Sequence, residues 1–134
     1  MTMFGLDTNV VVRLLTNDDP QQRAAALAFA EGLGREYTAF ISLVTVVELD
    51  WALRLRLEFS RQDTARAIGR LLQVGGLVFE YHNLVVKALR LVTKENVDLA
   101  HALIAVRSVE VGCRSTKTFD KKAVSRVPGM ELLV

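Results

Sequence analysis

The sequence predicts an α/β protein whose short sheet is mostly parallel. Short apolar runs alternate with segments of helical spacing along the chain, which is typical of strands connected through helices that cover both faces of a sheet. The chain has 134 residues, and 51% of them are hydrophobic. That length and composition suit one soluble domain, so we expect residues 1–134 to form a single domain around one core.

The first half of the chain contains two strand candidates, each followed by helical spacing. We expect strands at residues 3–6 and 37–42, and helices at 9–15, 20–33 and 45–57. Asp19 and Pro20 mark the start of the second helix as its N-cap and first helical residue, and Gly34 marks its end. This order already contains two strand-to-helix connections, as a parallel sheet requires.

The second half continues the alternation. A helix begins at residues 60–63 and ends at the glycines 75 and 76, before a strand at 77–81. Helices are expected at 83–92 and 98–109, followed by strands at 113–118 and 130–133. The turn Val127-Pro128-Gly129 leads into the last strand.

Three acidic residues follow the predicted strands. Asp7 comes directly after the first strand, Glu48 lies in the helix after the second, and Asp120 lies just beyond the fourth. Because sites in such sheets form beyond the carboxyl ends of the strands, we expect these carboxylates at one edge. Converging carboxylates hold a hard divalent cation such as Mg²⁺, and such an ion activates water for attack on phosphorus. Phosphodiester hydrolysis is the reaction that this arrangement favours.

Each acid also has a purely structural interpretation. Asp7 could cap the helix that begins near Asn9, and Asp120 could be a turn residue between strand and helix. Glu48 could be favoured in the first helical turn by the helix dipole, or could form a surface pair with Arg54. Their shared position after strands favours a site over three coincidences.

Four segments spread over nearly the whole chain carry these acids. They are Leu6-Asp7-Thr8-Asn9-Val10, Ser42-Leu43-Val44 leading to Val47-Glu48-Leu49, Asp98-Leu99-Ala100-His101-Ala102-Leu103-Ile104-Ala105, and Thr118-Phe119-Asp120-Lys121-Lys122-Ala123. In this order and at these separations they resemble the motifs of PIN-domain ribonucleases, particularly the VapC toxins of prokaryotic toxin–antitoxin systems.

The resemblance implies a three-layer α/β/α sandwich and cleavage of RNA that depends on Mg²⁺ or Mn²⁺. It also implies a homodimer and inhibition by a cognate VapB-like antitoxin that occupies the active-site groove. Under this resemblance Asp7, Glu48 and Asp120 match the catalytic acids of the family. Asn9 and Thr118 match the small polar residues that help to orient those acids.

The third acidic position departs from the family pattern. The family usually has an aspartate where this chain has His101, although Asp98, three residues earlier, matches a further aspartate of many members. We therefore expect Asp7, Glu48, Asp98 and Asp120 to be catalytic, with Asp7, Asp98 and Asp120 as metal ligands and His101 as a further candidate ligand.

Three outcomes remain open for this position. Asp98 could take over the missing role, His101 could shift the metal preference from Mg²⁺ toward Mn²⁺, or catalysis could be weakened. The structural alternatives are an N-cap for Asp98 and a hydrogen bond from His101 to a neighbouring acid. The second function that we consider is accordingly a catalytically impaired PIN-fold module that binds RNA or an antitoxin.

The charge balance is nearly neutral, with 17 Lys and Arg against 15 Asp and Glu. Near the motifs, the candidate RNA-binding residues are Arg13, Lys117, Lys121 and Lys122. A single cysteine, the lack of a secretory signal and the lack of an apolar run long enough to cross a membrane predict a cytoplasmic protein.

Overall fold

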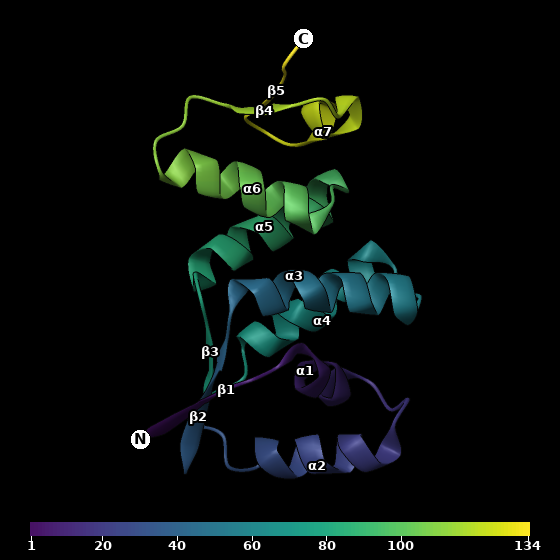
Figure 1. The fold of residues 1–134 in the computed structure, drawn as a ribbon, viewed down its shortest axis with the longest axis vertical. Coiled ribbons are helices and arrows are strands. Elements are labelled where there is room, and N and C mark those ends of the chain that lie inside the picture. Colours follow the sequence, from purple (N-terminus) through teal and green to yellow (C-terminus); the bar gives the residue numbers. More distant parts are fainter. The chain divides into compact units, whose positions relative to one another are not determined.

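The computed structural model describes residues 1–134, which form two compact units, Met1–His82 and Asn83–Val134 (Figure 1). We call them unit 1 and unit 2. Each unit combines helices with short parallel strands, so the predicted α/β class is confirmed. None of the helices is both long enough and apolar enough to span a bilayer.

Unit 1 is built on a three-stranded parallel sheet. Its strands are β1 (Thr2–Gly5), β2 (Tyr37–Ile41) and β3 (Leu77–Phe79), in the order β1-β2-β3. Phe4 of β1 is in register with Ala39 of β2, and Phe40 of β2 with Val78 of β3. The carboxyl ends of the three strands therefore point the same way, as the sequence predicted.

Four α-helices follow these strands in unit 1: α1 (Thr8–Leu15), α2 (Pro20–Ala30), α3 (Leu43–Trp51) and α4 (Arg61–Leu72). Helix α1 contacts both α2 and α3 (Figure 1). The core is made of fully buried side chains from the central strand and three of the helices; these are Val11, Val12, Ala39, Ile41, Val46, Leu49, Leu53 and Ile68. Since α2 buries only Ala26, the core forms mainly from β2, α1, α3 and α4.

Helix α3 departs from the sequence prediction at both ends. Ser42, which we assigned to the preceding strand, is its N-cap and accepts a hydrogen bond from the backbone N–H of Thr45 at 3.2 Å. At the other end the helix widens into a π-helical turn, η1 (Ala52–Arg56), in which the N–H of Leu57 donates to the carbonyl of Ala52 at 3.2 Å. This turn changes which residues share a face of the helix, because a π-helical turn contains more residues than an α-helical one.

Unit 2 contains the remaining helices and a two-stranded parallel sheet. The helices are α5 (His82–Glu95), α6 (Leu99–Glu110) and α7 (Lys121–Arg126), and the strands are β4 (Thr116–Thr118) and β5 (Met130–Leu132). Thr116 is in register with Met130. Strand β4 is shorter than predicted, because residues 113–115 are used in the turn after α6, where the N–H of Cys113 donates to the carbonyl of Ser108.

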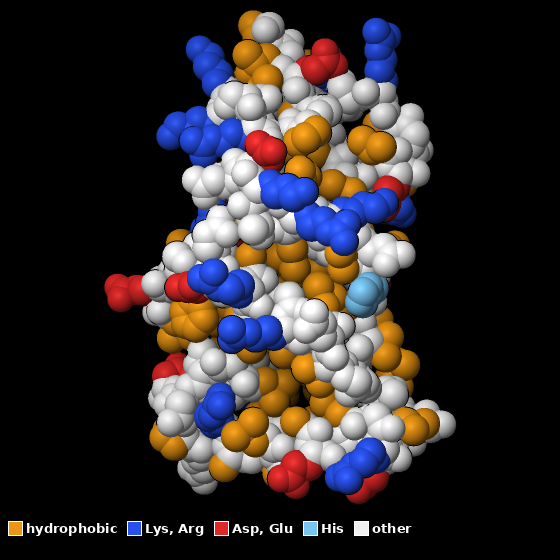
Figure 2. All heavy atoms as spheres, turned by 180° about the vertical axis from the view of Figure 1, so that it is seen from behind, with side chains coloured by type: hydrophobic (Ala, Val, Ile, Leu, Met, Phe, Trp, Pro, Cys, Tyr) orange, Lys and Arg blue, Asp and Glu red, His pale blue; other side chains and the backbone are white.

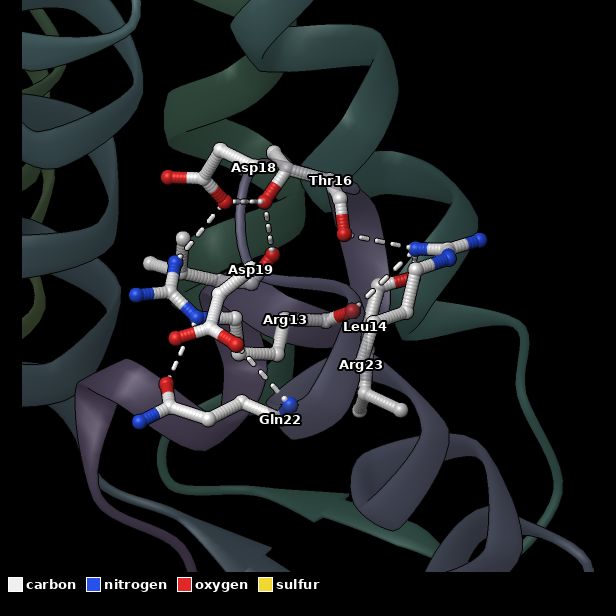
Figure 3. A network of polar contacts seen from close by, with 8 residues as sticks. Arg13, Leu14, Thr16, Asp18, Asp19, Gln22 and Arg23 are labelled. Atoms are coloured by element: carbon white, nitrogen blue, oxygen red, sulfur yellow. Dashed lines mark hydrogen bonds and ion pairs between the residues drawn. The ribbon is translucent and has the colours of Figure 1, made fainter.

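A network of polar side chains joins α1 to α2 (Figure 3). The guanidinium of Arg23 donates to the carbonyls of Arg13, Leu14 and Thr16 at 3.1, 3.3 and 2.9 Å. These carbonyls lie at the C-terminal end of α1, where no intrahelical donor remains for them. Asp19 caps α2, as predicted, and accepts from the N–H of Gln22. The network therefore fixes the end of α1 against the start of α2.

We predict that Arg23→Met lowers the free energy of unfolding by about 1–3 kcal/mol, because three carbonyls lose a charged donor. Urea denaturation followed by circular dichroism would measure the change. Arg35→Met is the matched control, since Arg35 is exposed and donates to a single carbonyl, that of Glu31. It should change stability by about 0.5 kcal/mol or less. Equal effects of the two substitutions would contradict the role assigned to Arg23.

Candidate functional site

Asp7 lies between the end of β1 and the start of α1. Its backbone is extended, with φ −77° and ψ 155°, and its Oδ1 accepts from the N–H of Thr8 at 2.8 Å, so it is the N-cap of α1. The structural interpretation of Asp7 is therefore correct. This capping role does not exclude a role as a metal ligand, because the hydrogen bond to Thr8 uses only one of the two carboxylate oxygens of Asp7.

Glu48 is held by a side chain from a different helix. The hydroxyl of Thr8, at the first position of α1, donates to Oε1 of Glu48 in α3 at 2.7 Å. Thr8 is buried whereas Glu48 is exposed, so the hydroxyl end of this hydrogen bond is shielded from solvent. Thr8 was not predicted as a site residue, although it stands between Asp7 and Asn9 in the first motif.

The prediction that Glu48 could lie in the first turn of its helix is wrong. Because α3 begins at Leu43, Glu48 lies beyond the first turn, where the helix dipole would favour it most. Arg54 pairs with the buried carboxylate of Asp50, through two hydrogen bonds of 3.0 and 2.9 Å.

The carboxylates of Asp7 and Glu48 line one cavity of about 390 Å³ in unit 1. The complete lining consists of residues from the start of α1 and from the end of α3 with its π-helical turn: Asp7, Thr8, Asn9, Glu48, Trp51, Ala52, Leu55 and Arg56. Asn9, predicted to support the acids, thus shares the cavity with two of them. Trp51 and Arg56 were not predicted from the sequence.

Asp98 and Asp120 are also helix N-caps. In unit 2, Oδ2 of Asp98 accepts from the N–H of His101 at the start of α6, at 3.2 Å. Oδ1 of Asp120 accepts from the N–H of Ala123 at the start of α7, at 3.0 Å. The hydroxyl of Thr118 accepts from the N–H of Asp120 at 3.0 Å, so Thr118 orients the segment that carries this acid.

His101 lies between these two carboxylates. Its Nδ1 is 3.4 Å from Oδ2 of Asp98, and its Nε2 is 3.9 Å from Oδ2 of Asp120. About one third of the imidazole is exposed. The structure therefore brings together Asp98, His101 and Asp120, with the histidine near enough to interact with both acids.

The carboxyl group of Asp120 has a pKa below its ordinary value. The main cause is the hydrogen bond from the backbone N–H of Ala123; burial acts in the opposite direction, and the charge of His101 adds to the lowering. Asp120 is therefore ionised at neutral pH. A metal ligand needs this ionised form, and the helix dipole favours it at the N-cap.

Three of the predicted RNA-binding residues lie near Asp120. Lys121 and Lys122 are exposed at the start of α7, and Lys117 of β4 is 3.5 Å from the carboxylate of Glu131. Arg13 lies in unit 1 and is already engaged with Asp18 at 2.9 Å and with Gln22 at 2.8 Å (Figure 3). Lys121 and Lys122 are thus better disposed than Arg13 to contact phosphate, whereas Lys117, like Arg13, already has an acidic partner.

The charges are unevenly divided between the units. Unit 2 has nine Lys and Arg against five Asp and Glu, a formal charge of +4, whereas unit 1 has eight against ten, a formal charge of −2. Figure 2 shows Lys and Arg side chains, drawn in blue, on the face that it presents. Unit 2 therefore provides the surface with the stronger attraction for a polyanion.

The donor atoms of these residues suit a hard cation. No group of three or more His, Cys, Asp or Glu side chains is arranged to hold a metal ion. However, Asp7 and Glu48 line one cavity, and Mg²⁺ is usually held by only one or two carboxylates while it keeps several waters. Oxygen donors favour Mg²⁺, and the imidazole of His101 is a donor that Mn²⁺ also accepts.

The sequence model of the PIN domain matches residues 5–129, a span that includes all the candidate acids. The chain therefore belongs to the PIN domain family, and the predicted PIN fold is confirmed.

Two solved structures are similar to the chain. One is VapC20 of Mycobacterium tuberculosis, described as a toxin that cleaves the sarcin–ricin loop; it is 15% identical, with 92% of this chain and 94% of that chain covered and a TM-score of 0.42. The other is a toxin–antitoxin complex from Klebsiella pneumoniae, 17% identical, with 98% and 96% covered and a TM-score of 0.35. No curated protein matches the sequence.

We predict that the carboxyl group of Asp120 titrates below pH 3.8 in the folded protein, and that His101→Gln moves its midpoint upward by removing a nearby positive charge. Because the folded pKa is lowered, the contribution of this carboxylate to stability is present above the unfolded pKa and is lost as pH falls through the folded pKa. Carbon-detected NMR of the carboxyl group would give the midpoint. His82→Gln, which replaces the other histidine, should leave it unchanged; a midpoint at or above 3.8 in the natural protein would rule out this explanation.

Proposed function

We propose that the protein is a metal-dependent endoribonuclease of the VapC type, which hydrolyses RNA phosphodiester bonds. The observation that carries the proposal is the fixed orientation of the PIN-motif acids. Asp7, Asp98 and Asp120 are each held by a backbone N–H at a helix start, and Glu48 is held by the hydroxyl of Thr8. Carboxylates fixed in this way are preorganised for a cation.

In this proposal Asp7, Glu48, Asp98 and Asp120 hold Mg²⁺ or Mn²⁺, with His101 as a further ligand candidate. When bound, such an ion lowers the pKa of water and offsets negative charge on the phosphoryl oxygens. Thr8 and Thr118 position the acids, and Asn9 supplies a polar group in the cavity that contains Asp7 and Glu48.

The RNA backbone is the part of the substrate that the basic residues contact. Lys117, Lys121 and Lys122 are the principal candidates because they flank Asp120 on the positively charged unit 2. Arg13 contributes only when it exchanges its contact with Asp18 for one with phosphate. Such contacts supply affinity without sequence preference.

The same proposal includes the biological setting that the VapC resemblance implies. The two units act together as one PIN domain, residues 1–134, in a cytoplasmic homodimer whose activity a cognate VapB-like antitoxin blocks. The family match over residues 5–129 supports the single domain, because it spans both units.

We predict that the antitoxin-free protein cleaves a mixed pool of structured RNA in Mg²⁺ or Mn²⁺ but not in EDTA. Asp7→Asn and Asp120→Asn should each lower the cleavage rate by about 100-fold or more, through loss of a charged ligand. Because asparagine also caps helices, both variants should keep their fold. Asp19→Asn is the matched control: Asp19 caps α2 outside the candidate site, so cleavage should be unchanged.

Combining the two substitutions tests whether Asp7 and Asp120 serve one catalytic centre. Residues that act as a unit are strongly non-additive, so the double variant should be little slower than the slower single variant. If the fold-loss in cleavage rate of the double variant equals the product of the two single losses, the two acids act independently. Equal cleavage in EDTA and Mg²⁺ would exclude the metal-dependent nuclease altogether.

The second candidate function is an impaired PIN-fold module that binds RNA or an antitoxin. The position of His101 favours it, since the imidazole lies between Asp98 and Asp120, where the family usually has another acid.

For His101 we predict that substitution by aspartate changes the metal-dependent cleavage rate by less than about tenfold, a barrier change of about 1.4 kcal/mol. The reason is that Asp98 is already in place beside it. Single-turnover rates of the natural protein and of His101→Asp, measured in Mg²⁺ and Mn²⁺, provide the test. A much larger gain in His101→Asp would identify the natural chain as the impaired module.

A further inference from the structure

The cavity that contains Asp7 and Glu48 has an aromatic and cationic part that the proposed hydrolysis does not use. Trp51 and Arg56 both line it, next to the carboxylates. Trp51 is the only tryptophan of the chain, and it is 47% exposed although tryptophan is usually well buried. The core does not need this side chain, because Leu49 and Leu53 of the same helical segment are fully buried.

Helix geometry explains why Trp51 and Glu48 share the cavity. They are three residues apart in α3, and residues at this spacing are neighbours on one helical face. The indole therefore lies one turn beyond the carboxylate, on the same side of the helix. Ala52, which is also in the lining, is small and buried, so it leaves room beside the ring.

The π-helical turn explains how Arg56 reaches the same cavity. Arg56 is eight residues after Glu48, whereas two turns of an ordinary α-helix take about seven. The wider turn at Ala52–Arg56 takes up the additional residue and returns Arg56 to the face of Glu48. Such turns occur frequently at functional sites. Arg56 is also exposed and is the only basic residue in the lining.

We propose that Trp51 and Arg56 form a nucleotide-binding subsite next to the catalytic carboxylates. The indole stacks on an unpaired base, and the guanidinium contacts a backbone phosphate of the same strand. The inference rests on the proposed function and adds to it a binding position for one unpaired nucleotide, since a paired base is already stacked within its helix and cannot cover the indole.

RNA fits this part of the cavity better than an apolar protein segment does. An apolar protein segment would cover Trp51 and Leu55, but it would also bury the charges of Asp7, Glu48 and Arg56, which is costly without matching polar groups. A nucleotide has a flat apolar face for the ring and an anionic phosphate for the guanidinium. Burial of Trp51 against a second copy of the chain is the competing outcome of the test.

The fluorescence of Trp51 is a direct probe, because no other tryptophan contributes. The full chain carrying Asp7→Asn, which cannot cut RNA in our proposal, is titrated in Mg²⁺ with a hexamer of adenylate. The natural protein is titrated in EDTA as a second condition. We expect the hexamer to quench the emission, and an abasic ribose-phosphate hexamer of the same charge to bind without quenching. Binding of the adenylate hexamer without quenching would overturn the proposal.

Substitutions test the two side chains separately, with a labelled hexamer followed by fluorescence anisotropy. Trp51→Leu should weaken binding by about 5- to 100-fold, whereas Trp51→Phe, which keeps an aromatic ring, should come within about threefold of the parent. Arg56→Gln should weaken binding and lower the slope of log affinity against log salt by about one. Arg70→Gln, which removes an exposed arginine of α4 outside this cavity, should retain that slope.

The outcomes separate this proposal from the nuclease itself. Quenching and loss of binding in Trp51→Leu, from a protein that cuts no RNA, would leave the subsite standing and remove the nuclease. Metal-dependent cleavage, together with equal RNA binding by Trp51→Leu and the parent, would support the nuclease and overturn the subsite. Self-association in ultracentrifugation that Trp51→Leu abolishes, without any RNA effect, would assign this surface to a second copy and overturn the subsite.

Discussion

The candidate site depends on the fact that one carboxylate can begin a helix and still bind something else. Asp7, Asp98 and Asp120 each accept a hydrogen bond from a backbone N–H at the start of α1, α6 or α7. The positive end of the helix dipole favours the ionised side chain there, and the hydrogen bond restricts its rotamer. Capping and ligand placement are therefore the same interaction, and the structural and functional interpretations of these acids do not exclude each other.

Glu48 is the exception, since it lies within α3 and has no helix start to hold it. Its orientation comes from Thr8, whose own position follows from the cap: once Asp7 begins α1, the next residue is the first of the helix. The buried hydroxyl then reaches Glu48 at 2.7 Å. The end of β1 thus determines the orientation of two acidic side chains: that of Asp7 directly, and that of Glu48 through the hydrogen bond from Thr8.

The features that depend on local sequence signals could be predicted. The side-chain contacts that depend on the tertiary fold could not. The order of strands and helices and the capping aspartates follow from periodicity and residue type within a few positions. The contact of Thr8 with Glu48 spans 40 residues, and no local signal indicates it. Arg56 was missed because, in an ordinary α-helix, a residue eight positions after Glu48 lies about 80° around the axis from it, and the π-helical turn that reduces this angle was not predicted. The contacts of Arg13 with Asp18 and Gln22 were likewise not predicted from its closeness in sequence to Asp7.

The presence of His101, where the family usually has an aspartate, also has an electrostatic consequence. A third carboxylate beside Asp98 and Asp120 would add like charge, which needs a cation or a donor to offset it. An imidazole adds no negative charge and presents ring nitrogens at 3.4 and 3.9 Å from the two acids. The acids of unit 2 thus already have a partner within the protein. In the cavity of unit 1, Asp7 and Glu48 have Arg56 as the only basic residue in the lining, so they carry the stronger demand for an added cation.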